Sequence, residues 1–239
     1  MFTEIEHQND NGKPEQNNKK DAKYLTDDEI ISQCIFFFVA GFETTASAIT
    51  HTIFKLSHDS QIQQRLCDEV CEKLADIDVD NLEEYYETIT NKIPYLDAVL
   101  KETLRMYPPV TRLERCLNAD GYKLGDIPLE KGNLIEISTV AMHYDPNYFS
   151  NPHEYFPERF LPENKHKIVP YSYIPFGEGP RNCVGMRFAY QEAKICLASL
   201  IQKYRFEANA KTPKQLQFPK RNGLSISLPF EISIHSRSD

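Results

Sequence analysis

The positions of the prolines divide this chain into helical and loop-rich parts. No proline interrupts residues 27–56, and residues 26–29 (Thr-Asp-Asp-Glu) form a capping box with acidic side chains in the first turn. These two features predict one long helix over 27–56. Prolines are frequent between 146 and 175, which predicts loops. None stands between Gly185 and Tyr204, where apolar residues at helical spacing predict another helix.

Apolar periodicity places the remaining elements. Residues 62–74 and 94–107 carry apolar side chains at helical spacing, and each stretch predicts a helix that lies on a core. Short apolar runs separated by turns between 122 and 137 predict small strands. Alternation over 224–234, after the turn pair Asn222–Gly223, predicts another strand. Because helix outweighs strand, the predicted fold class is mainly α with a small β region.

Composition and charge exclude several classes of protein. With 41% hydrophobic and 26% charged residues the chain is an ordinary globular protein, and its net charge of −8 argues against nucleic acid as a partner. The longest uninterrupted apolar run, 35–42, is far shorter than the roughly 20 residues that span a bilayer, so no transmembrane helix is expected. Residues 1–24 are polar, lack a secretory signal and are predicted to form a flexible tail or loop.

Cysteine spacing argues against a zinc site or a redox dithiol. The six cysteines contain no close CxxC pair, so most are expected to be reduced, small, buried apolar side chains. They stand at positions 34, 67, 71, 116, 183 and 196.

One cysteine, Cys183, needs a different explanation. It stands in the glycine-rich loop 175–185, immediately ahead of a predicted helix. Glycines let the backbone approach a flat cofactor and turn amides toward one sulfur, and the helix adds positive potential at its amino end. Both effects favour thiolate over thiol, which indicates a metal ligand. A single cysteine that merely packs in a loop is the simpler interpretation of Cys183 alone.

The whole loop resembles the cytochrome P450 signature, an aromatic residue followed by glycines, an arginine and a cysteine at fixed spacing. The resemblance implies that Cys183 binds the iron of haem (iron protoporphyrin IX) and that Arg181 pairs with a haem propionate. The matching residues, all implied to bind the cofactor, are Phe176, Gly177, Gly179, Arg181, Cys183 and Gly185.

The segment 40–45 (Ala-Gly-Phe-Glu-Thr-Thr) resembles the family's helix that crosses the haem. The resemblance implies that Ala40 contacts the cofactor and that Glu43 and Thr44 are catalytic, because cleavage of bound O₂ consumes protons that a carboxylate beside a hydroxyl can relay. From the residues alone, a mid-helix threonine such as Thr44 usually donates to a preceding carbonyl.

Two further segments resemble structural motifs of the family. Glu102 and Arg105, with Arg159 in the segment 156–160, are implied to form a buried ion-pair triad, although the residues alone favour a solvated pair worth about 0.2–0.5 kcal/mol. Arg115, in a predicted strand, is implied to reach a haem propionate.

The resemblance covers residues 25–239 and implies the carboxyl-terminal portion of the P450 fold, the haem-binding part of a single domain whose amino-terminal half is absent. It is strongest to animal, particularly insect-type, microsomal P450s of xenobiotic metabolism. The implied activity is a haem-thiolate monooxygenase that inserts one oxygen atom from O₂ into a lipophilic small molecule. Its electrons would come from NADPH through NADPH-cytochrome P450 reductase. The implied location is the cytosolic face of the endoplasmic reticulum membrane, with membrane association only for the complete protein.

Two alternatives stay open at this point. The chain is also consistent with a truncated, non-catalytic P450 fragment without stable haem, because half of the family domain is absent. A cysteine hydrolase, with Cys183 as nucleophile and His143 or His153 as base, is the third interpretation, although neither histidine stands in a catalytic signature.

Overall fold

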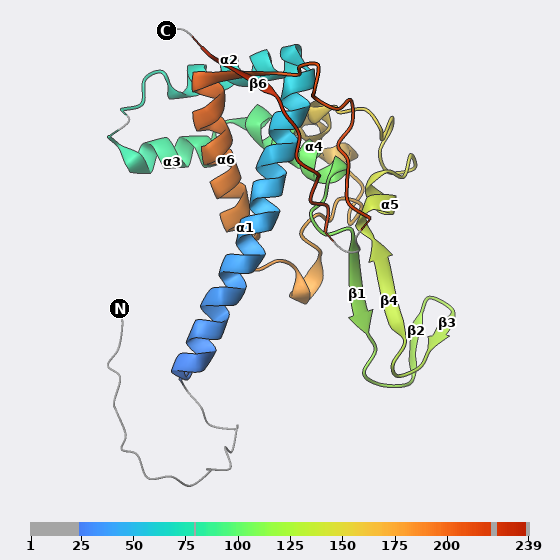
Figure 1. Cartoon of the computed structure of the whole chain (residues 1–239). Coiled ribbons are helices and arrows are strands. Elements are labelled where there is room, and N and C mark those ends of the chain that lie inside the picture. The colour runs from blue at the N-terminus through green and yellow to red at the C-terminus, as the bar shows by residue number, and fades with distance from the viewer. Residues whose placement is uncertain (1–23, 79, 221–223, 238–239) are drawn as a thin grey trace, which may run out of the picture. The chain divides into compact units, whose positions relative to one another are not determined.

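The computed structural model describes residues 24–78, 80–220 and 224–237. The predicted tail therefore lies outside the described residues except for Tyr24, and so does the turn pair Asn222–Gly223. The helices of the described part are α1 (Asp27–His58), α2 (Ser60–Leu74), α3 (Leu82–Asn91), α4 (Pro94–Met106), α5 (Thr139–His143) and α6 (Met186–Lys203), with 3₁₀ helices η1 (Pro157–Phe160), η2 (Pro162–Lys167) and η3 (Gly179–Arg181). The strands are β1 (Arg112–Cys116), β2 (Tyr122–Leu124), β3 (Ile127–Leu129), β4 (Leu134–Ser138), β5 (Tyr204–Glu207) and β6 (Ser233–Ser236) (Figure 1).

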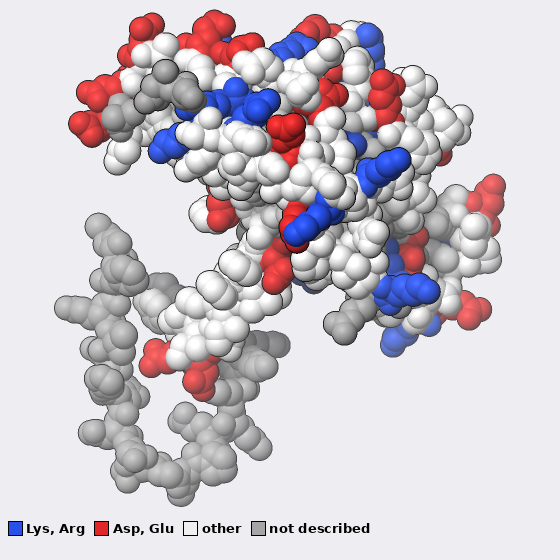
Figure 2. All heavy atoms as spheres, turned by 45° about the horizontal axis from the view of Figure 1, so that its top comes forward, with Lys and Arg blue, Asp and Glu red and all other residues white. Residues whose placement is uncertain are grey.

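The predicted helices and the fold class are confirmed, and the chain divides into two compact units whose boundary falls inside α1, after Phe38. In the first unit, the capping box forms as expected. The Thr26 amide donates to Glu29 Oε2 at 2.9 Å, and the Glu29 amide donates to Thr26 Oγ1 at 3.3 Å. The first part of α1 is largely uncharged beyond its acidic first turn (Figure 2), and Phe36, Phe37 and Phe38 are exposed there.

By length and composition α1 is able to cross a membrane. The expectation of no such helix rested on uninterrupted apolar runs, and it stays a prediction because length and composition alone are weak evidence for a membrane span. Core helices of soluble proteins pass the same test. The buried residues of α1 all lie between Thr45 and Ser57.

In the second unit, α4 is the central helix of the core. Ten of its thirteen residues are buried, and it packs against α2, α6 and the 3₁₀ helix η1. Pro94 occupies the first turn, where a missing amide hydrogen costs nothing. α6 packs against α2 and α3 as well, and Figure 1 shows α2 across one end of α6. α4 therefore holds together the elements on both sides of the loop that carries Cys183.

Within the residues that the structure describes, the β region consists of three two-stranded antiparallel sheets. β1 pairs with β4 in a register that sets Arg115 opposite Ile135, and the strands predicted between 122 and 137 are confirmed. The strand predicted over 224–234 is largely wrong, because regular pairing is confined to β6 and its partner β5. Alternation predicts an extended backbone but not a partner strand, and Pro229 has no amide hydrogen for a ladder.

Apolar periodicity did not predict α3. Asn81 caps this helix, because its side chain accepts from the Glu84 amide at 3.4 Å and donates to the Glu84 carboxylate at 2.9 Å. An Asn followed three residues later by Glu is a capping-box pattern, so the signal was present in the sequence.

The carboxylate of Glu102 is the centre of a buried ion-pair triad. Arg105 donates to both of its oxygens at 2.8 Å, from Nε and Nη2, and Arg159 Nε approaches Oε1 at 3.4 Å. The Phe156 amide donates to the same oxygen at 2.9 Å. Glu102 and Arg105 have fully buried side chains, so the predicted triad is confirmed and the solvated surface pair is wrong.

Removal of the Arg105 guanidinium is expected to destabilise the fold strongly. Arg105→Ala leaves the Glu102 carboxylate desolvated with a weaker partner, which should cost about 3–5 kcal/mol in the free energy of unfolding. Urea denaturation measures the loss. Glu231→Gln, which breaks the exposed pair between Lys211 and Glu231, is the matched control and should change little. Equal effects of the two variants would contradict a buried triad.

Candidate functional site

The loop that carries Cys183 is closed by its own backbone. The Cys183 amide donates to the Phe176 carbonyl at 2.9 Å, and the Asn182 amide donates to the Gly179 carbonyl at 3.1 Å. Gly177 and Gly179 have φ values of +74° and +78°, which side chains with a Cβ rarely adopt. Two of the glycines singled out in the sequence are therefore required by the turn itself.

Cys183 is exposed at the tip of this loop, three residues ahead of α6. Its apolar neighbours Val184 and Phe188 are 82% and 67% exposed. A Cβ added at Gly185 would lie 3.9 Å from Cys183 Sγ, which is an ordinary van der Waals contact. An accessible thiol surrounded by exposed apolar groups suits an apolar, metal-containing ligand.

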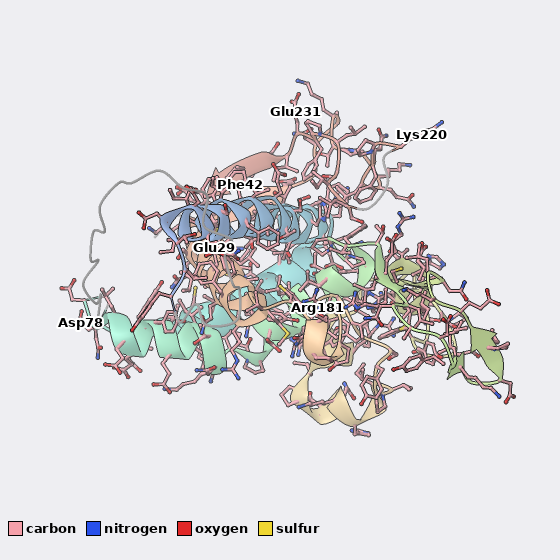
Figure 3. All side chains as sticks on the ribbon, turned by 90° about the horizontal axis from the view of Figure 1, so that it is seen from below. Glu29, Phe42, Asp78, Arg181, Lys220 and Glu231 are labelled. Atoms are coloured by element: carbon pink, nitrogen blue, oxygen red, sulfur yellow. The ribbon has the colours of Figure 1, made fainter. Side chains whose placement is uncertain are left out.

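The structure brings the two predicted propionate partners together. Arg115, on β1, donates from Nη2 to the Arg181 carbonyl at 3.5 Å and from Nη1 to the Glu114 carbonyl at 2.6 Å. Figure 3, which views the protein from below, shows Arg181 on the loop beside the amino end of α6. Both guanidinium groups are exposed, so the edge of the Cys183 loop carries two positive charges available to an anionic group.

His143 connects the triad to the Cys183 loop, and sequence reasoning did not assign it this role. Its Nδ1 lies 3.0 Å from the Arg105 carbonyl, and its Nε2 lies 2.9 Å from the Ile174 amide. A carbonyl only accepts and an amide only donates, so Nδ1 carries the hydrogen and the ring is neutral. Burial lowers the pKa of His143 to about 4, which agrees with a neutral ring at neutral pH. The Ile174 carbonyl in turn accepts from the Gly177 amide at 3.0 Å, inside the loop.

The same contacts argue against the cysteine hydrolase. A general base must have a free ring nitrogen directed at the nucleophile. Both nitrogens of His143 are engaged by backbone groups in the core, and His153 packs its ring against Tyr144 at 5.2 Å between centroids. His143 is therefore a structural connection and does not activate Cys183.

The segment of α1 singled out in the sequence reaches the same region. Thr44, Thr45 and Ala48 line a narrow crevice of about 30 Å³ together with Phe176 of the loop and Tyr190 of α6. The Thr44 hydroxyl donates to the Ala40 carbonyl at 2.7 Å, as expected for a mid-helix threonine, and its oxygen can still accept a hydrogen bond. Thr44 and Phe176 are thus brought together.

Glu43 lies on a different side of α1 from Thr44. With Ser47, Thr50 and His51 it lines a cavity of about 410 Å³ whose other wall is the segment 226–232. Glu43 is exposed, so its carboxylate is open to water. The crevice and this cavity are separate features, and the structure does not bring the Glu43 carboxylate to the Cys183 loop.

Gly41 faces open space in the second unit. A Cβ added at this position would meet no described atom within 4 Å. Contact with another described part of the chain therefore does not require a glycine at position 41.

Comparison with known proteins decides the family. The family model for cytochrome P450 matches residues 2–234. The chain belongs to the cytochrome P450 family. Cytochrome P450 3A11 of Mus musculus is 40% identical over 224 residues, which are 92% of this chain and 43% of the mouse protein. Cytochrome P450 3A9 of Rattus norvegicus is 38% identical over 226 residues, 94% of this chain and 44% of the rat protein.

This P450 chain thus spans less than half the length of the curated relatives it matches. The family predicted from the cysteine loop and its companion motifs is confirmed. The relatives named above are rodent proteins, and the narrower resemblance to insect-type P450s stays a prediction.

Substitution of two buried histidines of this P450 chain should change the free energy of unfolding by different amounts. His143 makes two hydrogen bonds, whereas both ring nitrogens of buried His51 lack a partner among the described residues. We expect His143→Phe to destabilise by about 1–3 kcal/mol, because the Ile174 amide is left unsatisfied, and His51→Phe to be neutral or stabilising. Urea denaturation of both variants at neutral pH measures the difference. A loss in His51→Phe as large as in His143→Phe would contradict this account.

The pH dependence of stability follows from the same two groups. Burial lowers the pKa of each from 6.5 to about 4. Between these pKa values the unfolded chain binds more protons than the folded chain. The free energy of unfolding is therefore not reduced by these histidines above about pH 6.5, and it decreases as the pH falls toward 4. The unfolding free energy of His51→Phe should decline less over this range than that of the unsubstituted chain. Equal declines would exclude His51 as a contributor.

Proposed function

We propose that the protein to which this chain belongs is a haem-thiolate monooxygenase with Cys183 as the iron ligand. The observation that carries the proposal is the position of Cys183, exposed on a loop that its own hydrogen bonds close. His143 links that loop to the buried triad. A thiolate that binds a metal must be both accessible and fixed, and this loop provides both. When bound, haem supplies the oxygen chemistry, assisted by electron density from the thiolate.

The residues around Cys183 fit a haem group. The exposed side chains of Val184 and Phe188 offer apolar contact to a macrocycle, and the backbone turns at Gly177 and Gly179 keep side chains out of the loop. Arg115 and Arg181 supply positive charge for carboxylates at its edge. Chemistry that suits each part of haem is therefore present at one loop.

Thr44 and Glu43 are the groups that we propose to handle protons. The Thr44 oxygen can accept from a donor in the crevice while its hydrogen is held by the Ala40 carbonyl. Glu43 is exposed to water in the adjacent cavity, one residue away along the helix. A proton taken from water by the Glu43 carboxylate would reach the Thr44 hydroxyl only through water that passes around α1. Ala40 lies one turn before Thr44 and is proposed to contact the cofactor.

Substrate, electron donor and location are proposed from the family. A lipophilic small-molecule substrate is proposed from the resemblance of the chain to the cytochrome P450 family. NADPH would supply electrons through NADPH-cytochrome P450 reductase. The complete protein is proposed to lie at the cytosolic face of the endoplasmic reticulum membrane and to act in xenobiotic metabolism.

A carbon monoxide difference spectrum tests the ligand. The reduced complete protein with CO should show the red-shifted Soret band of a thiolate-ligated haem, and Cys183→His should lose the band but keep haem absorbance. Cys116→Ser, on strand β1, is the matched control and should keep the band. Persistence of the red-shifted Soret band in Cys183→His would contradict the proposal that Cys183 is the iron ligand.

Haem retention by the 239-residue chain distinguishes a haem-binding P450 chain from a P450 fragment without stable haem. A stoichiometric haem complex of this chain through purification would exclude the alternative of a P450 fragment without stable haem. Loss of haem from the chain but not from the complete protein would support that alternative for the chain alone.

Arg115 should contribute to haem affinity more than its neighbour on the same strand. Arg115→Gln is expected to weaken binding of hemin roughly fivefold, equivalent to about 1 kcal/mol for an exposed charge pair. Arg112→Gln is the control, because Arg112 is already paired with Glu114 at 2.7 Å. Soret titration measures both affinities, and equal losses would contradict a propionate contact by Arg115.

A further inference from the structure

Two cysteines outside the proposed haem site stand one turn apart on α2. Cys67 Sγ and Cys71 Sγ are 3.8 Å apart, at the i and i+4 positions of the helix. Residues with this spacing lie on the same helix face, so the backbone fixes the distance between them. The haem-thiolate chemistry proposed for Cys183 uses neither cysteine.

The two thiols differ in accessibility. Cys67 is 5% exposed and belongs to the hydrophobic core, whereas Cys71 is exposed. Burial is the main cause that raises the pKa of Cys67 to about 11, and the neighbouring Cys71 raises it further, so this sulfur is protonated at neutral pH. A thiol-reactive molecule would therefore react with Cys71 first, and Cys67 lies close enough to form a second bond to the same molecule.

The separation of the sulfurs decides which chemistry suits them. A disulfide needs the sulfurs at about 2.0 Å, so its formation would have to move this helix turn. A zinc ion takes four ligands, and among the described residues no group of three or more His, Cys, Asp or Glu side chains is placed to hold a metal. A thiophilic atom that binds two sulfurs at once bridges them at a larger sulfur–sulfur separation than a disulfide does. Such an atom fits this pair with little movement of the helix.

We propose that Cys67 and Cys71 form a chelating site for a monosubstituted trivalent arsenical, such as phenylarsine oxide. Two As–S bonds form and two S–H bonds break. The arsenic-bound oxygen leaves as water with the two thiol protons, and arsenic stays trivalent, so no oxidant or reductant is needed. The site spans one turn of α2 and is independent of haem.

Competition with a monothiol tests the chelate in the 239-residue chain. The reduced protein is treated with one equivalent of phenylarsine oxide and then exposed to excess 2-mercaptoethanol, and bound arsenic is measured by intact mass. The second sulfur acts at a high effective concentration, so Cys71→Ser should weaken retention by roughly 10²- to 10⁴-fold. Release by 2,3-dimercaptopropanol, a competing dithiol, is expected for the unsubstituted chain.

Two controls make the outcome decisive. Cys116→Ser removes another exposed cysteine outside the pair and should retain arsenic fully. Cys71→Ser alters an exposed side chain, so its fold should survive, and circular dichroism checks this. Retention in Cys71→Ser equal to that of the unsubstituted chain, or peptide mapping of the arsenic to cysteines other than 67 and 71, would overturn the proposal.

Discussion

The desolvated carboxylate of Glu102 is the constraint on which the rest of this fold depends. A buried charge is tolerated only where partners surround it, and here two guanidinium groups and one backbone amide do so. These partners come from α4 and from the segment around η1, which are far apart in the sequence. The carboxylate therefore fixes the position of the proline-rich segment against the central helix, where hydrophobic packing alone would allow alternatives.

The same cluster reaches the cysteine loop through one imidazole. Arg105 donates from Nη1 to the His143 carbonyl at 2.9 Å, and its own carbonyl accepts from the His143 ring. The other nitrogen of that ring accepts from the Ile174 amide, and Ile174 immediately precedes the loop. Glu102, Arg105 and His143 thus hold the backbone of the Cys183 loop in place, and none of them takes part in a reaction of the sulfur. Family-specific structure around a metal ligand is often of this kind, because a ligand that moves binds weakly.

Sequence reasoning succeeded where local signals were strong. The capping box at Thr26, the proline at the start of α4 and the helical spacing after Gly185 each acts over a few residues, and each predicted an element that the structure contains. The motif around Cys183 was specific enough to give the family.

The predictions failed, or stayed incomplete, where the answer depends on distant partners. Alternation over 224–234 indicated a strand, but no local signal tells which other segment it pairs with, and most of it pairs with none in a ladder. The role of His143 was missed for the same reason, since its partners Arg105 and Ile174 are more than thirty residues away on either side. Burial of Glu102 was expected only through the family, because an i, i+3 ion pair looks the same on a surface helix.

The contrast between His143 and His51 shows that burial alone does not indicate what a polar side chain contributes. Both rings are almost fully buried, and burial lowers the pKa of each to about 4. His143 recovers the cost of desolvation through two backbone hydrogen bonds that fix its tautomer. His51 recovers none through hydrogen bonds within the described residues and is held by edge-on contacts with Tyr107 and Phe218. Its unsatisfied ring lies on α1, in the wall of the cavity that Glu43 also lines, so the local cost in stability falls beside a residue that is proposed to handle protons. Sites that perform chemistry commonly carry such costs, because their side chains are selected for reactivity and access, and the stability that they lose has to come from the rest of the fold.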